Sequence, residues 1–268
     1  MLHGTADLAR RLDRAEIDFC ALAARADGPG GVASLEVAGG RALCSVAGSP
    51  LNKVLGLGLG AAVEDADLDA IEAFYDERGI PVQIELCPLA VPGLATRLTK
   101  RGYQLQAFEN QLARRLDGGS EPEPNLRVTP VTPDLDEVWL RVVATGFATA
   151  DGSEAAPPSP DVVDRLQVVM RGFVHPDIER MLVWVDDEPA GGASAFVIDS
   201  VLGITGTATL PGFRRRGVQR AALAYALERG VGRAGLAMTT TEPGSISQRN
   251  FERFGFQVVY TRAIFVLD

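Results

Sequence analysis

Apolar positions in the first half of the chain switch between helical and strand spacing. Leu8, Leu12, Ile17 and Ala21 recur at helical spacing, and the glycines from Gly28 onward end this pattern. Short β-like runs and two further helical patterns follow. The predicted elements are, in order, the helix Ala6–Ala24, the strands Val32–Val37, Ala42–Val46 and Asn52–Leu59, the helix Asp65–Arg78, the strand Pro81–Leu86, the helix Gly93–Lys100 and the strand Gln104–Leu112.

The second half repeats this order of parts with longer strands. Its predicted elements are the strand Leu126–Val131, the helices Pro133–Ala144 and Asp161–Arg171, the strands Arg180–Val185, Gly191–Ile198 and Val201–Thr209, the helix Arg216–Arg229, the strand Leu236–Thr241, the helix Ile246–Phe254 and the β-runs Gln257–Thr261 and Ala263–Leu267. Both halves are therefore predicted to be α+β, with a mixed, mostly antiparallel sheet flanked by helices.

The ends of the two halves also match residue by residue. Residues 100–105 read KRGYQL and residues 253–258 read RFGFQV. In each segment a glycine, Gly102 or Gly255, follows a predicted helix and leads into a strand, where a left-handed backbone is expected. Together with the shared order of elements, the match predicts two copies of one fold.

A linker composition separates the copies. Residues 117–124 read DGGSEPEP, with no apolar side chain. We therefore expect domains at 1–117 and 125–268, joined by a linker at 118–124. A second stretch rich in proline, residues 150–160, falls between two predicted helices and is interpreted as a long loop, a kind of segment that is often functional in a compact domain.

Composition indicates a folded protein without a membrane segment. Of the 268 residues, 46% are apolar and 23% charged, and no apolar run reaches the length of a bilayer span. Five charged residues, Asp7, Arg10, Arg11, Asp13 and Arg14, lie within the first 14 positions, where a signal peptide would be apolar, so a cytoplasmic location is expected. The net charge of -9 argues against binding to nucleic acid or to a membrane surface.

Cysteine and histidine are too few for several kinds of site. Cys20, Cys44 and Cys87 form no CxxC pair, and small buried side chains are the favoured interpretation. His3 and His175 are the only histidines, so the sequence has too few of the residues that zinc sites and Ser-His-Asp triads require, and no metal is expected. A loop or surface position is favoured for His175.

One segment has the features of an anion site. Residues 210–223 stand between a predicted strand and a predicted helix and contain the pattern R-x-x-G-x-Q at 214–219. Successive backbone N–H groups and the helix N-terminus can surround a phosphate there, and Gly217 lets the backbone approach it. Residues 201–262 hold nine basic and three acidic side chains, so the acidic chain has one basic segment.

At this point the sequence resembles the GNAT superfamily of N-acetyltransferases, whose signature is [QR]-x-x-G-x-[GA]. The resemblance implies two tandem GNAT-like (acyl-CoA N-acyltransferase) domains and, in residues 125–268, a site for acetyl-CoA whose pyrophosphate the signature amides hold. Gln219 takes the place of the usual last Gly or Ala. The residues implied to contact the cofactor are Ala208, Leu210, Arg214, Arg215, Arg216, Gly217, Val218, Gln219, Arg220, Ser247, Asn250 and Phe251.

The first half resembles a degenerate copy. Where its phosphate loop should be, Gly56–Gly60 runs into Glu64, Asp65 and Asp67, without an arginine. These carboxylates would repel a diphosphate, so a structural or substrate-shaping role is expected. A dinucleotide-binding interpretation of the glycines lacks the βαβ context.

The resemblance implies direct transfer of an acetyl group from acetyl-CoA to a primary amine on a small molecule or peptide. Many relatives have a tyrosine at the position of Phe251, which serves the departing thiolate; here Tyr260, water or the substrate would supply the proton. Glu242 is the candidate base, with an exposed carboxylate or a helix N-terminal acid as the other interpretation. Asp199 is a weaker candidate, and Ser245 is interpreted as an N-cap.

Two function classes stay open. The first is an active N-acetyltransferase. The alternative is a pseudoenzyme or interaction module that binds acyl-CoA without transferring the acyl group. The sequence identifies neither the amine nor the assembly, and a homodimer is one of the assemblies left open.

Overall fold

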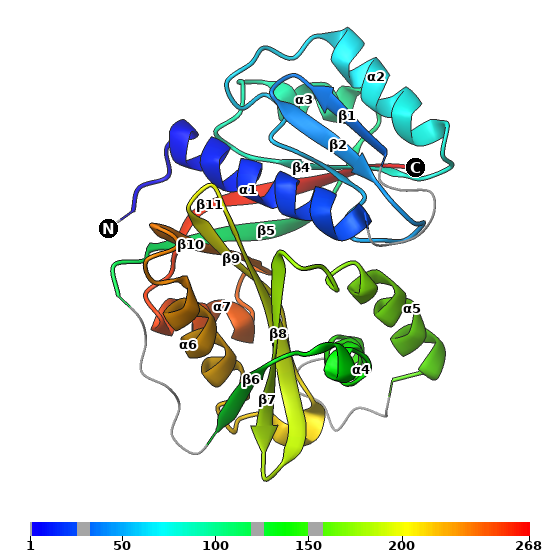
Figure 1. Cartoon of the computed structure of the whole chain (residues 1–268). Coiled ribbons are helices and arrows are strands. Elements are labelled where there is room, and N and C mark those ends of the chain that lie inside the picture. The colour runs from blue at the N-terminus through cyan, green and yellow to red at the C-terminus, as the bar shows by residue number, and fades with distance from the viewer. Residues whose placement is uncertain (1, 26–32, 119–125, 150–157) are drawn as a thin grey trace. The chain divides into compact units, whose positions relative to one another are not determined.

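The computed structural model describes residues 2–25, 33–118, 126–149 and 158–268 (Figure 1). Contacts divide the chain into two compact units. Unit 1 comprises Met1–Ala113, Thr240–Pro243 and Gln257–Asp268, and unit 2 comprises Arg114–Thr239 and Gly244–Phe256. The predicted boundaries cut the chain in sequence order, whereas the structure groups residues 257–268 with the first half. Apart from residue 118 and residues 158–160, the predicted linker and the predicted long loop lie outside the described residues.

The described residues of unit 1 form a six-stranded sheet with three helices. Its strands lie in the order β1-β2-β3-β4-β11-β5, with β3 and β4 parallel and the other neighbouring pairs antiparallel. The last strand of the chain therefore lies between β4 and β5. The elements are α1 (Ala6–Arg25), β1 (Ala33–Val37), β2 (Gly40–Cys44), β3 (Lys53–Leu55), α2 (Asp65–Asp76), β4 (Val82–Leu86), α3 (Leu94–Lys100), β5 (Gln104–Arg115) and β11 (Gln257–Leu267).

The two faces of this sheet differ in chemistry because side chains alternate along each strand. On β4, Val82, Ile84 and Leu86 join an apolar core with buried residues of α2 and α3. Glu85 lies between them in sequence, is buried, and shares Lys53 with a glutamate of α1. One face of the sheet is thus a conventional core, and the other carries buried charge beneath α1.

Two strand predictions in this region are corrected. The predicted strand Asn52–Leu59 is ordered as a strand only over Lys53–Leu55, because Gly56, Gly58 and Gly60 have positive φ and turn the chain. The two predicted β-runs at the end of the chain form one strand, β11. A register shift near Val259 and another near Ile264 accommodate irregularities without breaking it.

Unit 2 is a five-stranded sheet in the order β10-β9-β8-β7-β6, flanked by four α-helices among its described residues. Its strands pair antiparallel except β9 and β10, which are parallel. The elements are β6 (Arg127–Pro130), the 3-10 turn η1 (Pro133–Leu135), α4 (Asp136–Ala148), α5 (Pro160–Arg171), β7 (Ile178–Val185), β8 (Glu188–Ile198), β9 (Val201–Thr209), the 3-10 turn η2 (Pro211–Phe213), α6 (Val218–Gly230), β10 (Leu236–Thr241) and α7 (Ile246–Arg253).

Helices α4 and α6 cover opposite faces of this sheet, which Figure 1 shows on either side of β8. A Cβ on Gly191 would lie 2.5 Å from Val218 of α6, and one on the next residue, Gly192, would lie 3.0 Å from Val143 of α4. Neighbouring strand residues face opposite ways, so these two glycines let both helices pack closely on β8.

Several predictions are confirmed. Both units are α+β, and Gly102 and Gly255 have φ of +96° and +79° directly after α3 and α7. Cys20, Cys44 and Cys87 are buried and free. None of the described helices is long and apolar enough to cross a membrane.

Candidate functional site

Strands β9 and β10 separate part of the way along unit 2. Their pairing covers only Val201–Gly203 against Leu236–Met238, although β9 continues to Thr209. Within the described part of unit 2, β9 beyond Gly203 pairs with β8 alone. The free edge leaves backbone N–H and C=O groups that an extended ligand can pair with, as an added strand does.

A β-bulge lies on this free edge. Ser194 of β8 pairs with Thr205 and Gly192 pairs with Ala208, so β9 has one residue more than β8 between the two pairs. Gly206 absorbs the extra residue with φ +62°, and a Cβ there would lie 2.8 Å from the buried Ser194 hydroxyl. The bulge requires glycine.

The chain then turns into α6 through a segment with two left-handed residues. The N–H of Leu210 donates to the Ala190 carbonyl at 2.9 Å, which holds the end of β9 on β8. Arg215 has φ +63°, and Gly217, the N-cap of α6, has φ +83° and no side chain to cap the helix. The first N–H groups of α6 have no i−4 carbonyl, so they are aimed at this turn together with the positive end of the helix dipole. This arrangement suits a phosphate.

The arginines of the turn do not all face one ligand. Arg214 donates to the Thr149 carbonyl at 2.6 Å and so holds the C-terminal end of α4. Arg216 pairs with Asp186 at 3.2 Å and lies over the ring of Phe213. Arg215 and Arg220 are exposed. The phosphate role expected of these four side chains stays a prediction, and the structure gives Arg214 and Arg216 other partners.

Gln219 links three elements of unit 2. Its Nε2 donates to the Thr207 hydroxyl on β9 at 3.3 Å and to the Ser247 hydroxyl on α7 at 3.1 Å. Its Oε1 accepts from Asn250 at 2.6 Å. The sequence marks Gln219 as a departure from the GNAT pattern but gives no signal of this role, because its partners are 12 to 31 residues away.

Helix α7 contributes both polar and apolar residues. The Ser245 hydroxyl accepts from the Gln248 N–H at 3.0 Å, which confirms the predicted N-cap. Phe251 is 1% exposed and packs edge-on against Phe256, with ring centroids 5.1 Å apart. Phe251 is thus part of the core of unit 2, and its contact with the cofactor stays a prediction.

Ala208, Leu210 and Val218 complete the predicted contact set. Ala208 and Val218 are buried, and Leu210 is half-buried at the turn. The N–H of Leu210 already donates to Ala190, and the contact of these three residues with the cofactor stays a prediction.

Both predicted catalytic residues fall in unit 1. Glu242 is exposed and stands between β10 and α7 in the chain. Tyr260 is buried on β11 and donates its hydroxyl to Asp13 of α1. Burial raises the pKa of Tyr260 well above its usual range, and the adjacent Asp13 adds to the rise. Their catalytic roles stay predictions, and Tyr260 has a structural partner already.

A buried charge cluster beneath α1 was not predicted. Lys53 contacts Glu16 at 2.9 Å and Glu85 at 3.1 Å. Arg262, fully buried, contacts Glu16 at 2.7 Å, Glu85 at 3.2 Å and Glu109 at 3.6 Å, and also pairs with Asp13. Its members are Asp13, Glu16, Lys53, Glu85, Glu109 and Arg262.

The pKa values of two carboxyl groups in this charge cluster, Glu16 and Glu109, are shifted in opposite directions. Burial opposes ionisation of Glu16, but Arg262 and Lys53 together outweigh it and lower its pKa to about 2. Burial raises the pKa of Glu109 to about 7, and the charge of Glu85 adds to this effect. Oxygens of Glu16, Glu85 and Glu109 lie within 4.8 Å of one another, a spacing that would suit a metal ion. Lys53 and Arg262 supply positive charge at that place, so we interpret the cluster as structural.

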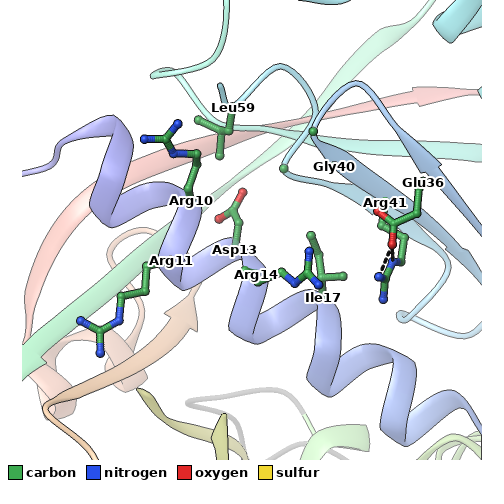
Figure 2. Close-up of a pocket in the computed structure, with 11 residues that line it drawn as sticks. Arg10, Arg11, Asp13, Arg14, Ile17, Glu36, Gly40, Arg41 and Leu59 are labelled. Carbon is green, nitrogen blue, oxygen red and sulfur yellow. Dashed lines mark hydrogen bonds and ion pairs between the residues drawn. The ribbon is translucent and has the colours of Figure 1, made fainter. Parts of the chain in front are cut away.

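Unit 1 also has a cavity of about 320 Å³ beside α1, shown in Figure 2. Arginines of α1 and β2 surround it. Its lining residues are Arg10, Arg11, Asp13, Arg14, Ile17, Glu36, Gly39, Gly40, Arg41, Gly56 and Leu59. Arg10 pairs with Asp7, Arg14 with Asp18, and Arg41 with Glu36, so carboxylates already offset the charge of these three arginines.

Comparisons with known proteins match part of the chain to one family and nearly all of it to one fold. Residues 151–256 match the family described as Acetyltransferase (GNAT) family. A GCN5-related N-acetyltransferase from Kribbella flavida is similar in structure, with a TM-score of 0.70 and 21% identity over 97% of this chain and 95% of that one. A tandem GNAT protein from the clavulanic acid biosynthesis pathway has a TM-score of 0.59 and 14% identity over 99% and 96%.

A third similar structure is the GCN5-related N-acetyltransferase from Sphaerobacter thermophilus, with a TM-score of 0.57 and 15% identity over 80% of this chain and 71% of that one. No curated protein sequence matches the chain significantly. At these identities the structures establish the fold alone, and a tandem GNAT fold accounts for nearly the whole chain.

Proposed function

Starting from the GNAT acetyltransferase domain at residues 151–256, we propose that the protein is an acyl-CoA-dependent N-acetyltransferase. It transfers an acetyl group from acetyl-CoA to a primary amine of a small molecule or peptide, by direct transfer. Acetyl-CoA is a substrate of this reaction, and unit 2 supplies its binding site.

The observation that carries the proposal is the junction of β9 and α6. There an unpaired strand edge runs into an uncapped helix N-terminus through two left-handed residues, Arg215 and Gly217. The strand edge suits the amide groups of the pantetheine arm, and the helix N-terminus suits the pyrophosphate. One ligand that has both groups in sequence is coenzyme A.

The transfer itself makes three chemical demands. The amine must lose a proton, the thioester carbonyl must be polarised, and the departing thiolate must be stabilised. Backbone N–H groups of β9 near Ala208 are our candidates for polarising the carbonyl. Glu242 is our candidate base, since an exposed carboxylate can take a proton from an amine that approaches from solvent.

A second candidate function rests on Phe251. Its ring is buried and has no hydroxyl to offer a thiolate. A protein that binds acyl-CoA without transferring the acyl group would be built in the same way around the β9–α6 junction. Both functions require CoA binding, and only the enzyme requires release of thiol in the presence of an amine.

Two measurements test these functions in turn. The first is the shift in Tm of the full chain on addition of CoA and of acetyl-CoA, which is expected to be positive. The second is release of free thiol from acetyl-CoA, read with a thiol reagent across a panel of primary amines. Absence of any Tm shift contradicts both functions, and binding without thiol release across the panel supports the pseudoenzyme.

Variants separate binding from transfer. Replacing Arg214, Arg215 and Arg216 together by alanine is expected to weaken CoA binding strongly. Glu242→Gln is expected to lower turnover and to leave CoA binding nearly unchanged. Unchanged turnover in Glu242→Gln removes Glu242 from the role of base.

A further inference from the structure

The hydrogen bonds around Gln219 have a fixed direction. A guanidinium can only donate, so Oδ1 of Asn250, 3.0 Å from Nη1 of Arg253, must accept. The amide nitrogen of Asn250 then faces Oε1 of Gln219 at 2.6 Å. This orients Gln219 with its nitrogen toward Ser247 and Thr207, and both N–H bonds of that nitrogen are used.

The direction of these bonds makes the hydroxyl oxygens of Ser247 and Thr207 acceptors toward Gln219. Because Ser247 and Thr207 each accept from Gln219, their own protons are directed elsewhere. Both side chains are half-buried, and neither hydroxyl donates a hydrogen bond to any of the described residues. Gln219 thus holds both hydroxyls at Thr207, in the stretch of β9 that does not pair with β10, and each keeps a proton that a ligand there can accept.

We propose that the Ser247 hydroxyl donates a hydrogen bond to the thiolate sulfur that leaves acetyl-CoA, and that Gln219 is the positioning residue that directs it. This inference rests on the proposed acetyltransfer. As the amine nitrogen bonds to the carbonyl carbon, the C–S bond breaks and its electron pair passes to sulfur. The proton that the amine loses ends on sulfur, so Ser247 undergoes no net change in protonation.

Ser247 is better placed for this task than Phe251 or Tyr260. It is the second residue of α7, so the positive end of that helix adds to the stabilisation of an anion. Phe251, one turn further on, has no donor and is buried. The hydroxyl of Tyr260 is already committed to Asp13 in unit 1.

The test uses CoA itself as the probe and needs no amine. The thiol of CoA bound to the full chain is titrated by its ultraviolet thiolate absorbance. A hydrogen bond from Ser247 stabilises the thiolate, so Ser247→Ala is expected to raise the pKa of the bound thiol by roughly one to two units. Ser245→Ala, which removes the capping hydroxyl of the same helix, serves as the control and is expected to leave that pKa unchanged.

Gln219→Glu tests the direction of the bonds with almost no change in shape. A carboxylate accepts from both hydroxyls and turns the Ser247 proton away from sulfur, so the pKa of the bound thiol is expected to rise. In the double variant with Ser247→Ala the two effects should not add, whereas a simple charge effect of the new glutamate would add.

The outcomes separate this inference from the proposed function. Failure of CoA to bind contradicts the proposed function. CoA that binds with the same thiol pKa in wild type and Ser247→Ala overturns the role of Ser247. Equal shifts in Ser247→Ala and Ser245→Ala overturn it as well, because they would assign the effect to the order of α7. Additive shifts in the double variant overturn the positioning role of Gln219.

Discussion

Replacing Glu109 by glutamine is expected to stabilise unit 1 above neutral pH. Burial and the charge of Glu85 raise the pKa of Glu109 from its ordinary 4.5 to about 7. Between these two values the folded protein holds a proton that the unfolded chain has lost, so stability falls as pH rises through this range. Above pH 7 the folded protein carries the full penalty of an ionised, mostly buried carboxylate.

The size of the effect follows from the same values. A rise in pKa from 4.5 to about 7, at about 1.4 kcal/mol per pH unit, corresponds to roughly 3 kcal/mol. Glutamine resembles the protonated side chain, so Glu109→Gln should recover up to that amount at pH 8.5 and nothing near pH 5. Glu16 acts in the opposite direction, because a pKa lowered to about 2 gives stability that is lost as pH falls below about 4.5.

Hydrogen exchange is the assay that can localise this change. Both tryptophans, Trp139 and Trp184, lie in unit 2, so their fluorescence does not report on unit 1. The free energy of opening is measured instead on peptides from α1, β4 and β11, in wild type and Glu109→Gln, at pH 5 and pH 8.5 after correction for intrinsic exchange. Glu77→Gln, at a site 72% exposed, is the control and should match wild type at both pH values.

One result would refute the reasoning: equal free energies of opening in wild type and Glu109→Gln at pH 8.5. A gain of the same size at pH 5 would also contradict it, because Glu109 should be protonated there and resemble glutamine already.

Substitutions at three further positions test the site and the charge cluster. Gly217→Ala places a Cβ on a residue with φ +83°. The free energy of unfolding, measured by thermal unfolding, is expected to fall by about 1 kcal/mol, and calorimetry should show weaker CoA binding. Unchanged binding would contradict the role of this turn. At Arg215, with φ +63°, Arg215→Gly should bind CoA more tightly than Arg215→Ala, since both remove the guanidinium but only glycine relieves the backbone; equal affinities would refute this. Arg262→Met leaves buried carboxylates without their cation, so the free energy of unfolding, measured by chemical denaturation at pH 7, is expected to fall by about 3–5 kcal/mol. A fall of less than about 1 kcal/mol would mean that the charge cluster is readily rearranged.

Hydrophobic spacing predicted most elements of the fold because each helix and strand buries one face. The prediction failed where glycine overrides it, since Gly56 and Gly58 end β3 although leucines continue the apolar run. The left-handed turn before α6 was also predictable, because Gly217 and the basic residues around it are adjacent in sequence. The start of α6 lies two residues later than predicted, since Gly217 is left-handed and cannot continue a helix backward.

Side-chain networks were not predictable from the sequence. Lys53 and Glu16 are 37 residues apart, and Arg262 and Glu16 are 246 apart. A single charge within a strand is ordinarily interpreted as facing solvent. No local pattern shows that four strands, β3, β4, β5 and β11, bring their charges to one side of a sheet. Gln219 escaped prediction for the same reason, since its partners come from β9 and α7.

The charge cluster also explains why the last strand of the chain lies in unit 1. One face of β11 places Ala263, Phe265 and Leu267 against the apolar core, and the other places Tyr260 and Arg262 in the charge cluster. A shift in register by one residue would exchange these faces and bury the guanidinium in apolar surroundings.

If β11 did not join the sheet, the carboxylates beneath α1 would lose Arg262, the cation they share, and would be buried without a partner charge. Both free-energy penalties favour a single position and a single register for β11. Burial of an apolar face alone would discriminate less strongly against other registers. The ionised Glu109 that lowers stability above pH 7 belongs to the same charge cluster. We infer that the charge cluster lowers the stability of unit 1 somewhat and determines which strand completes its sheet.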